Sequence, residues 1–134
     1  MTFSDWFVAR GRISRQTWWL RYQLPIVGLA ILAALADASF GYPVFSGAPD
    51  QGVVEYMGGP VSTAIGLLTL VPCISSTVAR LHDRGHSAWW LLWLLVPLGG
   101  PLVLLTQNGF LRGDGGPNRY GPAPGVPAPL SYTG

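Results

Sequence analysis

The chain has 134 residues, which suits one domain, and 49% of them are hydrophobic while only 10% are charged. A soluble domain carries about 25% charged residues, so this composition favours an integral membrane protein. The net charge is +2, and the eight basic residues, all arginines, are too scattered for a nucleic-acid-binding surface. The single cysteine, Cys73, excludes an intrachain disulfide framework and a cysteine-rich metal site.

Three apolar stretches approach the roughly 20 residues that a helix needs to cross the hydrocarbon core. They cover 18–36, 60–79 and 87–106. Ser14 suits the N-cap of the first helix, and Pro60 suits the first turn of the second. The first stretch also resembles a signal peptide, because arginines precede its apolar core and "ADA" at 36–38 resembles a cleavage site. We favour an uncleaved anchor, because the region before that core is long and two more apolar segments follow.

The segment "HDRGHS" at 82–87 predicts a tight corner that makes the second and third helices antiparallel neighbours. Gly85 suits the residue after a helix end, and Ser87 suits the N-cap of the next helix. Pro72 and Pro97 are expected to kink their helices, because each removes one backbone hydrogen bond.

The distribution of arginine predicts the orientation in the membrane. Arginines flank the start of the first helix and the end of the second, whereas the segment 37–59 has none. By the positive-inside rule, the N-terminus and the corner at 82–87 are cytoplasmic and the first loop is outside.

The third apolar segment allows two interpretations. A full, kinked crossing leaves the tail outside, which Arg112 and Arg119 mildly disfavour. Alternatively, "VPLGGPLV" turns the segment into a re-entrant hairpin, whose free backbone groups must be buried in protein or wetted. We favour the kinked crossing and leave the hairpin open.

The expected fold class is therefore all-α and integral to the membrane, with three transmembrane helices of which the third is kinked or re-entrant. We expect a single membrane domain over 1–122 and a flexible, Pro/Gly-rich C-terminal tail over 123–134. Small residues spaced four apart allow close helix packing, within one chain or between copies. They are Ala30, Ala34 and Ala38 in the first helix, and Ser62 and Gly66 in the second.

Three motifs resemble those of the domain of unknown function 805 family of small bacterial inner-membrane proteins. They are "GRISRQTWW" at 11–19, "ARLHDRGHSAWWLL" at 79–92 and "GDGGPNRYGP" at 113–122, in the family's order and spacing. Ala88 departs from the glycine more usual there, and 37–59 matches nothing recognisable. The resemblance implies a bacterial inner (plasma) membrane protein, but it implies no activity and supplies no catalytic residues.

The second and third motifs define a candidate polar corner. Its residues are Arg80, His82, Asp83, Arg84, Asn118, Arg119 and Tyr120. Asp83 is three positions from Arg80 on the same helix and can pair with it. The simplest interpretation is a cytoplasmic anchor that packs helix ends through salt bridges. An alternative is a site for an anionic lipid headgroup or small ligand, because arginine pairs bidentately with phosphate.

Catalytic and metal-binding interpretations are weaker. His82 and His86 have the spacing of a helix-borne metal pair, but Gly85 is expected to end the helix between them. No nucleophile elbow surrounds any serine near the corner, and the tail glycines lack the Gly-Lys-Ser/Thr of a phosphate loop. We therefore expect no metal, no cofactor and no enzymatic activity.

The favoured function is a non-enzymatic membrane scaffold or accessory subunit, multi-pass with a cytoplasmic N-terminus. The alternatives are a module that binds an anionic headgroup at the corner and, third, a membrane enzyme or transporter. The expected partners are the lipid bilayer, an anionic lipid, and a second copy or another membrane protein, but no nucleic acid. Arg119 and Tyr120 are expected to fold back onto the membrane surface. If the third segment is a hairpin, Arg119 can reach Asp83; if it crosses, about 30 Å separates them.

Overall fold

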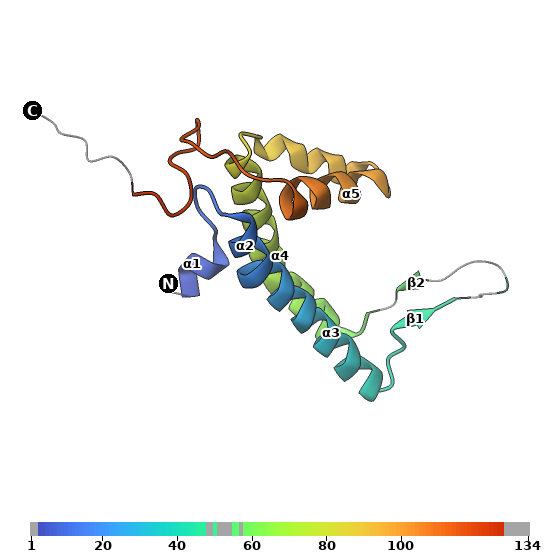
Figure 1. Ribbon diagram of the computed structural model, residues 1–134. Helices are drawn as coiled ribbons and strands as arrows, with labels where there is room; N and C mark the ends of the chain where they lie inside the picture. The colour runs from blue at the N-terminus through green and yellow to red at the C-terminus, as the bar shows by residue number, and fades with distance from the viewer. Residues whose placement is uncertain (1–2, 48–49, 51–54, 57, 128–134) are drawn as a thin grey trace, which may run out of the picture.

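Two long antiparallel helices form the body of the molecule in the computed structural model, which describes residues 3–47, 50, 55–56 and 58–127 (Figure 1). The first runs without a break through α2 (Arg15–Thr17), the π-helical η1 (Trp18–Gln23) and α3 (Leu24–Ser39). The second is α4 (Pro60–Asp83), which packs along α3. Both apolar segments therefore form helices, and each is longer than its apolar stretch alone.

Local signals set the ends of these helices. The Ser14 hydroxyl accepts a hydrogen bond from the Thr17 backbone N–H at 3.1 Å, as expected of an N-cap. Pro60 begins α4, and the first N–H groups of that helix are capped from α3. The Asp37 carboxylate accepts from the backbone N–H groups of Val61 at 3.0 Å and Ser62 at 2.7 Å. The end of α3 therefore holds the start of α4.

The buried residues of α3 differ from the predicted alanine stripe. On α3 the buried residues are Ala33 and Asp37, while Ala30 and Ala38 are exposed. On α4 the buried residues are Thr69, Pro72, Ser76, Ala79, Arg80, Leu81 and Asp83. The predicted stripe through Ala30 and Ala38 is therefore not the packing face within one chain.

Both helices are long and apolar enough to cross a membrane. They contain 25 and 24 residues, and at 1.5 Å per residue about 36 Å covers the hydrocarbon core. Large apolar side chains point away from the helix contact, and Leu32 and Leu67 are 65% and 68% exposed. Such an exterior suits lipid rather than water.

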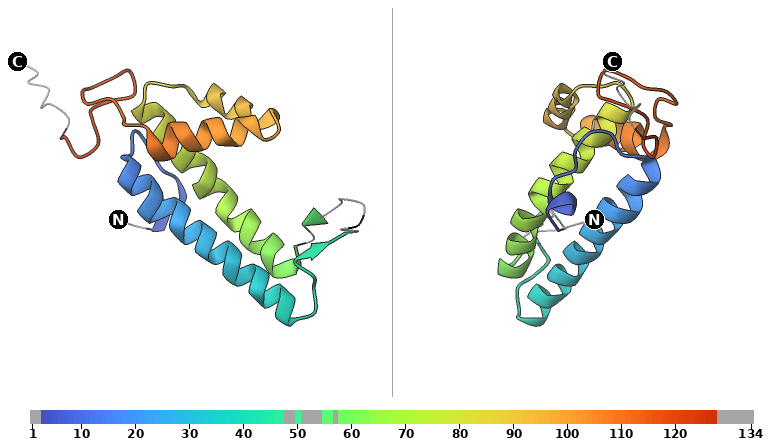
Figure 2. Two further views of the ribbon diagram at one scale, coloured as in Figure 1. Left: turned by 45° about the vertical axis from the view of Figure 1, so that its right-hand side comes forward. Right: turned by 90° about the vertical axis from the view of Figure 1, so that its left-hand side faces the viewer.

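The third apolar segment folds as a helical hairpin, as in the alternative interpretation, and not as the single kinked helix that we favoured. Whether the hairpin enters the membrane stays a prediction. A 3-10 helix, η3 (Ala88–Leu95), turns back into α5 (Gly99–Leu105), which continues as the π-helical η4 (Thr106–Phe110). Figure 2 shows η3 and α5 side by side at one end of the long pair. At the tip Leu98 has φ +63°, and the Gly99 N–H donates to the Pro97 carbonyl at 2.7 Å.

A close backbone approach explains why the hairpin turns where it does. A side chain at Gly100 would collide with the Trp93 carbonyl, whereas one at Gly99 would make only ordinary contact. Pro97 also lacks the N–H that a continuing helix needs. The chain therefore reverses at 96–98 instead of bending, which returns the tail to the corner.

Smaller elements complete the described fold. α1 (Phe3–Phe7) precedes a segment that lies against α4, where the Ala9 N–H donates to the Ser75 hydroxyl at 3.1 Å. Between the long helices, β1 (Phe45–Ser46) pairs antiparallel with β2 (Glu55–Tyr56), two short strands that the all-α prediction did not include. Of the predicted tail, 128–134 lie outside the described residues, and the division at 122 stays a prediction.

Candidate functional site

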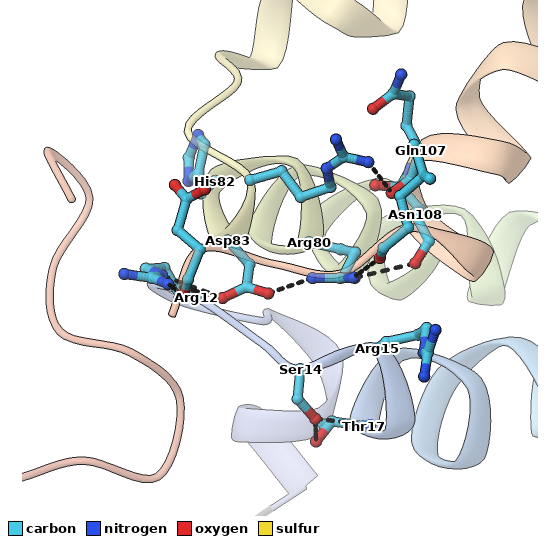
Figure 3. Close-up of polar contacts among 12 residues, drawn as sticks. Arg12, Ser14, Arg15, Thr17, Arg80, His82, Asp83, Gln107 and Asn108 are labelled. Carbon is cyan, nitrogen blue, oxygen red and sulfur yellow. Dashed lines mark hydrogen bonds and ion pairs between the residues drawn. The ribbon is translucent and has the colours of Figure 1, made fainter. Parts of the chain in front are cut away.

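The carboxylate of Asp83, at the end of α4, lies between two arginines (Figure 3). Its Oδ1 accepts from Arg12 Nε at 3.1 Å, and its Oδ2 accepts from Arg80 Nη1. The side chains of Arg12, Arg80 and Asp83 are 1%, 0% and 5% exposed. The predicted Arg80–Asp83 pair is confirmed, and a second arginine from the first motif joins it.

Arg12 uses the rest of its guanidinium to hold the segment after η4. Nη1 donates to the carbonyls of Gly116 at 2.7 Å and Gly121 at 3.0 Å, and Nη2 donates to that of Asp114 at 2.7 Å. Five donors in a rigid planar fork make arginine suited to such a multidentate clamp. Arg12 therefore joins the N-terminal segment, the end of α4 and the third motif.

Arg80 holds η4 and the residue after it through similar hydrogen bonds. Its Nε donates to the Asn108 carbonyl at 2.9 Å, and its Nη2 donates to the Leu111 carbonyl at 2.6 Å. A buried guanidinium is tolerated only when its charge and its donors are paired, and Arg80 meets both conditions. We call Arg12, Arg80 and Asp83 the arginine–carboxylate clasp.

The third motif packs directly against the clasp. The Asp114 N–H donates to the Asp83 carbonyl at 2.8 Å, and Asn118 Nδ2 donates to the His82 carbonyl at 2.9 Å. A side chain at Gly113 would collide with the Asp83 carboxylate, so the approach requires glycine at this position. The "GDGGPNRYGP" motif is therefore a docking segment for the end of α4.

Aromatic and cationic groups cover the outer side of the corner. The rings of His82 and Tyr120 stack with centroids 3.8 Å apart, and the Arg119 guanidinium lies 4.9 Å from the centre of the Tyr120 ring. Arg119 Nη2 also donates to the Gly85 carbonyl at 2.9 Å. Arg119 and Tyr120 therefore fold back onto the corner, but Arg12, not Arg119, is the second partner of Asp83. Their placement at the membrane surface stays a prediction.

Arg84 and His86 make fewer contacts than the other residues of the corner. Arg84 Nη1 donates to the Gln107 carbonyl at 3.3 Å, while its buried Nε has no hydrogen-bond partner among the described residues. His86 stacks on Trp90 with centroids 4.1 Å apart. Partial burial lowers the pKa of His86 below its ordinary value, and the positive charge of Arg84 lowers it further.

The two histidines do not share a face. Gly85 between them adopts a left-handed φ of +70°, as expected of a helix C-terminus, so the rings stack on different partners. Within the part of the chain that the structure describes, no three His, Cys, Asp or Glu residues converge as metal ligands would.

All seven residues predicted for the polar corner lie around the end of α4, and the structure brings the second and third motifs together there. Sequence reasoning missed Arg12 and the clamp that it forms. The only sequence signal of Arg12 was its place in the motif "GRISR", where it resembled an arginine that sets the orientation of a membrane helix.

These features define a small, mostly helical protein with two helices of membrane-spanning length, closed at one end by a buried arginine–carboxylate clasp. The chain belongs to the family described as "Protein of unknown function (DUF805)", whose model matches residues 6–122. The match includes all three motifs and confirms the resemblance noted in the sequence.

Two of the proteins similar to this chain are named as inner membrane proteins. The chain is 30% identical to "Inner membrane protein YhaH" of Escherichia coli over 90% of this chain and 96% of that protein. It is 42% identical to "Inner membrane protein YhaI" over 43% of this chain and 48% of the relative. It is also 30% identical to "Uncharacterized protein YiiR" over 72% of this chain and 56% of the relative. No solved structure matches the chain.

Proposed function

We propose that the protein crosses the inner membrane twice and keeps its N-terminus, its corner and its third motif on the cytoplasmic side. The return of the third segment supports this, because every arginine then lies toward one end of the helix pair. The opposite end, around Asp37 and Asp50, has no arginine. The positive-inside rule then agrees with Arg112 and Arg119 as well as with the first two motifs.

Single cysteines introduced into a Cys73→Ala variant test this orientation. An impermeant maleimide added to intact spheroplasts should label Asp50→Cys but not Arg119→Cys, and both should react after permeabilisation. Labelling of Arg119→Cys on intact spheroplasts would contradict the two-crossing topology.

For activity, we propose a non-enzymatic scaffold or accessory subunit. The observation that carries this proposal is that the guanidinium groups of Arg12 and Arg80 donate hydrogen bonds to Asp83 and to five backbone carbonyls. A saturated ion pair offers no free base, acid or nucleophile, since such groups must reach a substrate proton or electrophile. The clasp instead connects three remote segments, as a structural device would.

The scaffold proposal predicts assembly through the apolar faces of the long helices. Light scattering on the protein in native lipid discs should give a particle with a second copy or a second polypeptide in fixed ratio. Replacing the exposed Leu32 and Leu35 with alanine should weaken that assembly without lowering the melting temperature. A strictly monomeric particle with no second polypeptide would contradict the proposal.

A second candidate function is recognition of an anionic lipid headgroup beside the clasp. A polar groove of about 560 Å³ lies between Ser14–Gln16 and the third motif, lined by Arg15 and Arg112 together with Asp83 and Asp114. Arg112 is exposed and makes no hydrogen bond or ion pair within the described residues. The clasp neutralises Asp83, so Arg15 and Arg112 outnumber the remaining carboxylate of the groove, Asp114, and can attract phosphate.

Melting temperatures in lipid discs of phosphatidylglycerol and of phosphatidylcholine test whether the groove recognises an anionic headgroup. Phosphatidylglycerol should raise the melting temperature of the wild type, and Arg112→Gln should lose most of that gain. Arg10→Gln, at another exposed arginine outside the groove, should retain it. An equal loss in both variants would indicate general surface attraction and contradict a site.

A further inference from the structure

A small apolar pocket lies where the long helices meet the hairpin. Its volume is about 230 Å³, and its walls come from η1, α4, η3, α5 and η4. It is separate from the polar groove of the clasp, with which it shares no lining residue. Five helical elements thus contribute to this one pocket.

Unpaired polar groups distinguish this pocket from a packing defect. Trp18 and Asn108 line it and are only 5% and 1% exposed. The indole N–H of Trp18 and both side-chain polar atoms of Asn108 have no hydrogen-bond partner among the described residues. Buried polar groups in proteins are nearly always paired, so these groups call for a partner that the chain does not provide.

Both residues lie in π-helical turns. Trp18 begins η1, and Asn108 lies within η4. The two turns are joined by a hydrogen bond from Trp19 Nε1 to the Gly109 carbonyl at 3.0 Å. Single π-helical turns within longer helices occur frequently at functional sites, and η1 is such a turn, whereas η4 ends its helix.

The residues that line the pocket disfavour a charged ligand. No Asp, Glu, Lys, Arg or His contributes to the pocket wall. Arg80 bonds the Asn108 backbone carbonyl, but its own donors are spent on that carbonyl, on Leu111 and on Asp83. An ionised head would be buried without a counter-charge, so the occupant must be uncharged.

The rim opens toward lipid. Ile74, Leu94 and Leu105 line the pocket and are 45%, 55% and 39% exposed on the apolar surface. A volume of about 230 Å³ holds a single ring or the head of a larger molecule, below the range usual for drug-sized ligands. The remainder of a lipid-like molecule can extend over this rim.

We propose that this pocket binds an uncharged, lipid-like molecule through a carbonyl-bearing head. The indole N–H of Trp18 and the amide N–H of Asn108 donate to its carbonyl oxygens, and the apolar wall covers its ring or chain. Isoprenoid quinones and acylglycerols share this head chemistry.

Equilibrium dialysis in lipid discs tests the proposal with duroquinone, whose fully methylated ring carries two carbonyl oxygens. Durene, the same methylated ring without carbonyls, is the matched control. The wild type should bind duroquinone saturably above the level of empty discs, and should bind durene about tenfold more weakly, because the hydrogen bonds are lost. Equal retention of both compounds would overturn the proposal.

Variants separate binding from folding. Asn108→Leu should bind duroquinone about tenfold more weakly while its melting temperature is unchanged or raised, because it removes an unpaired buried amide. Trp18→Phe should also weaken binding, whereas Trp89→Phe, at a 76% exposed tryptophan outside the pocket, should not. Unaltered binding by Asn108→Leu would overturn the assignment.

Mass spectrometry of the organic extract from purified wild-type protein identifies the natural occupant without any variant. A quinone or an acylglycerol enriched over the bulk membrane would support the proposal and distinguish the two sources. A high-resolution structure that shows ordered water only in the pocket, together with an extract like the bulk membrane, would refute it.

Discussion

Arg12 and Asp83 are 71 positions apart in the chain and form a buried ion pair with a 3.1 Å separation. Their contact connects the segment before the first long helix to the last residue of the second. The same guanidinium also binds three carbonyls of the third motif. Removal of either partner is therefore expected to release more than one contact.

Arg12→Met should lower the free energy of unfolding by about 3 kcal/mol or more, because it leaves a buried carboxylate with one partner fewer. Asp83→Asn should also destabilise the protein, since two buried arginines lose their counter-charge. The double variant should be less destabilised than the sum of the single variants. Melting curves in one detergent measure all three, and additive effects would contradict direct coupling.

Gly113→Ala should destabilise the corner, because its methyl group would collide with the Asp83 carboxylate and Arg80. We expect a loss of about 1–3 kcal/mol, typical of overpacking. Gly115→Ala is the matched control, since a methyl group there meets no atom within 4 Å. Thermal denaturation of the two variants should differ, and equal melting temperatures would argue against the docking of the third motif.

Gly100→Ala should disrupt the hairpin through a collision with the Trp93 carbonyl, again at a cost of about 1–3 kcal/mol. Gly99→Ala, one position earlier, makes only a 3.7 Å contact with Val96 and should be tolerated. Proteolysis in discs, followed by mass spectrometry of the fragments, should show cleavage near 96–100 only in the first variant. A continuous third crossing helix would tolerate both substitutions.

His86 makes stability depend on pH. Its pKa is lowered by burial and by Arg84, so the folded state favours the neutral ring. An unfolded chain binds the proton near pH 6.5, at the ordinary pKa of histidine, so this stability is present above that pH and lost as pH falls below it. The melting temperature should therefore fall between pH 7.5 and 5.5, as is usual for a histidine that folding keeps neutral.

The change in melting temperature should be smaller in His86→Gln, which cannot titrate in this range. Gln107 and Asp114 favour the charged ring of His86, and Arg119 opposes it. The melting temperature of Asp114→Asn should therefore fall more steeply with decreasing pH than that of the wild type. A variant and wild type with the same pH dependence would assign the effect to another group.

Composition and motif order alone determined the membrane class, the family and the two long helices of this protein. Apolar length, a serine cap, a first-turn proline and the left-handed Gly85 are local signals, and each acts within a few residues. The Arg80–Asp83 pair belongs to the same category, because one helical turn brings the two side chains together.

Only the tertiary structure decided the third segment, the partner of Asp83 and the pocket. Two prolines and two glycines at 97–101 predict a weak point in a helix, but whether the chain bends or reverses there depends on what it packs against. Arg12, Asp83 and Gly116 are brought together from three remote segments, and an arginine that precedes an apolar helix has the same sequence signature whether it faces lipid headgroups or a buried carboxylate. The pocket between η1 and η4 likewise arises from the packing of five elements, so no local sequence pattern could predict it.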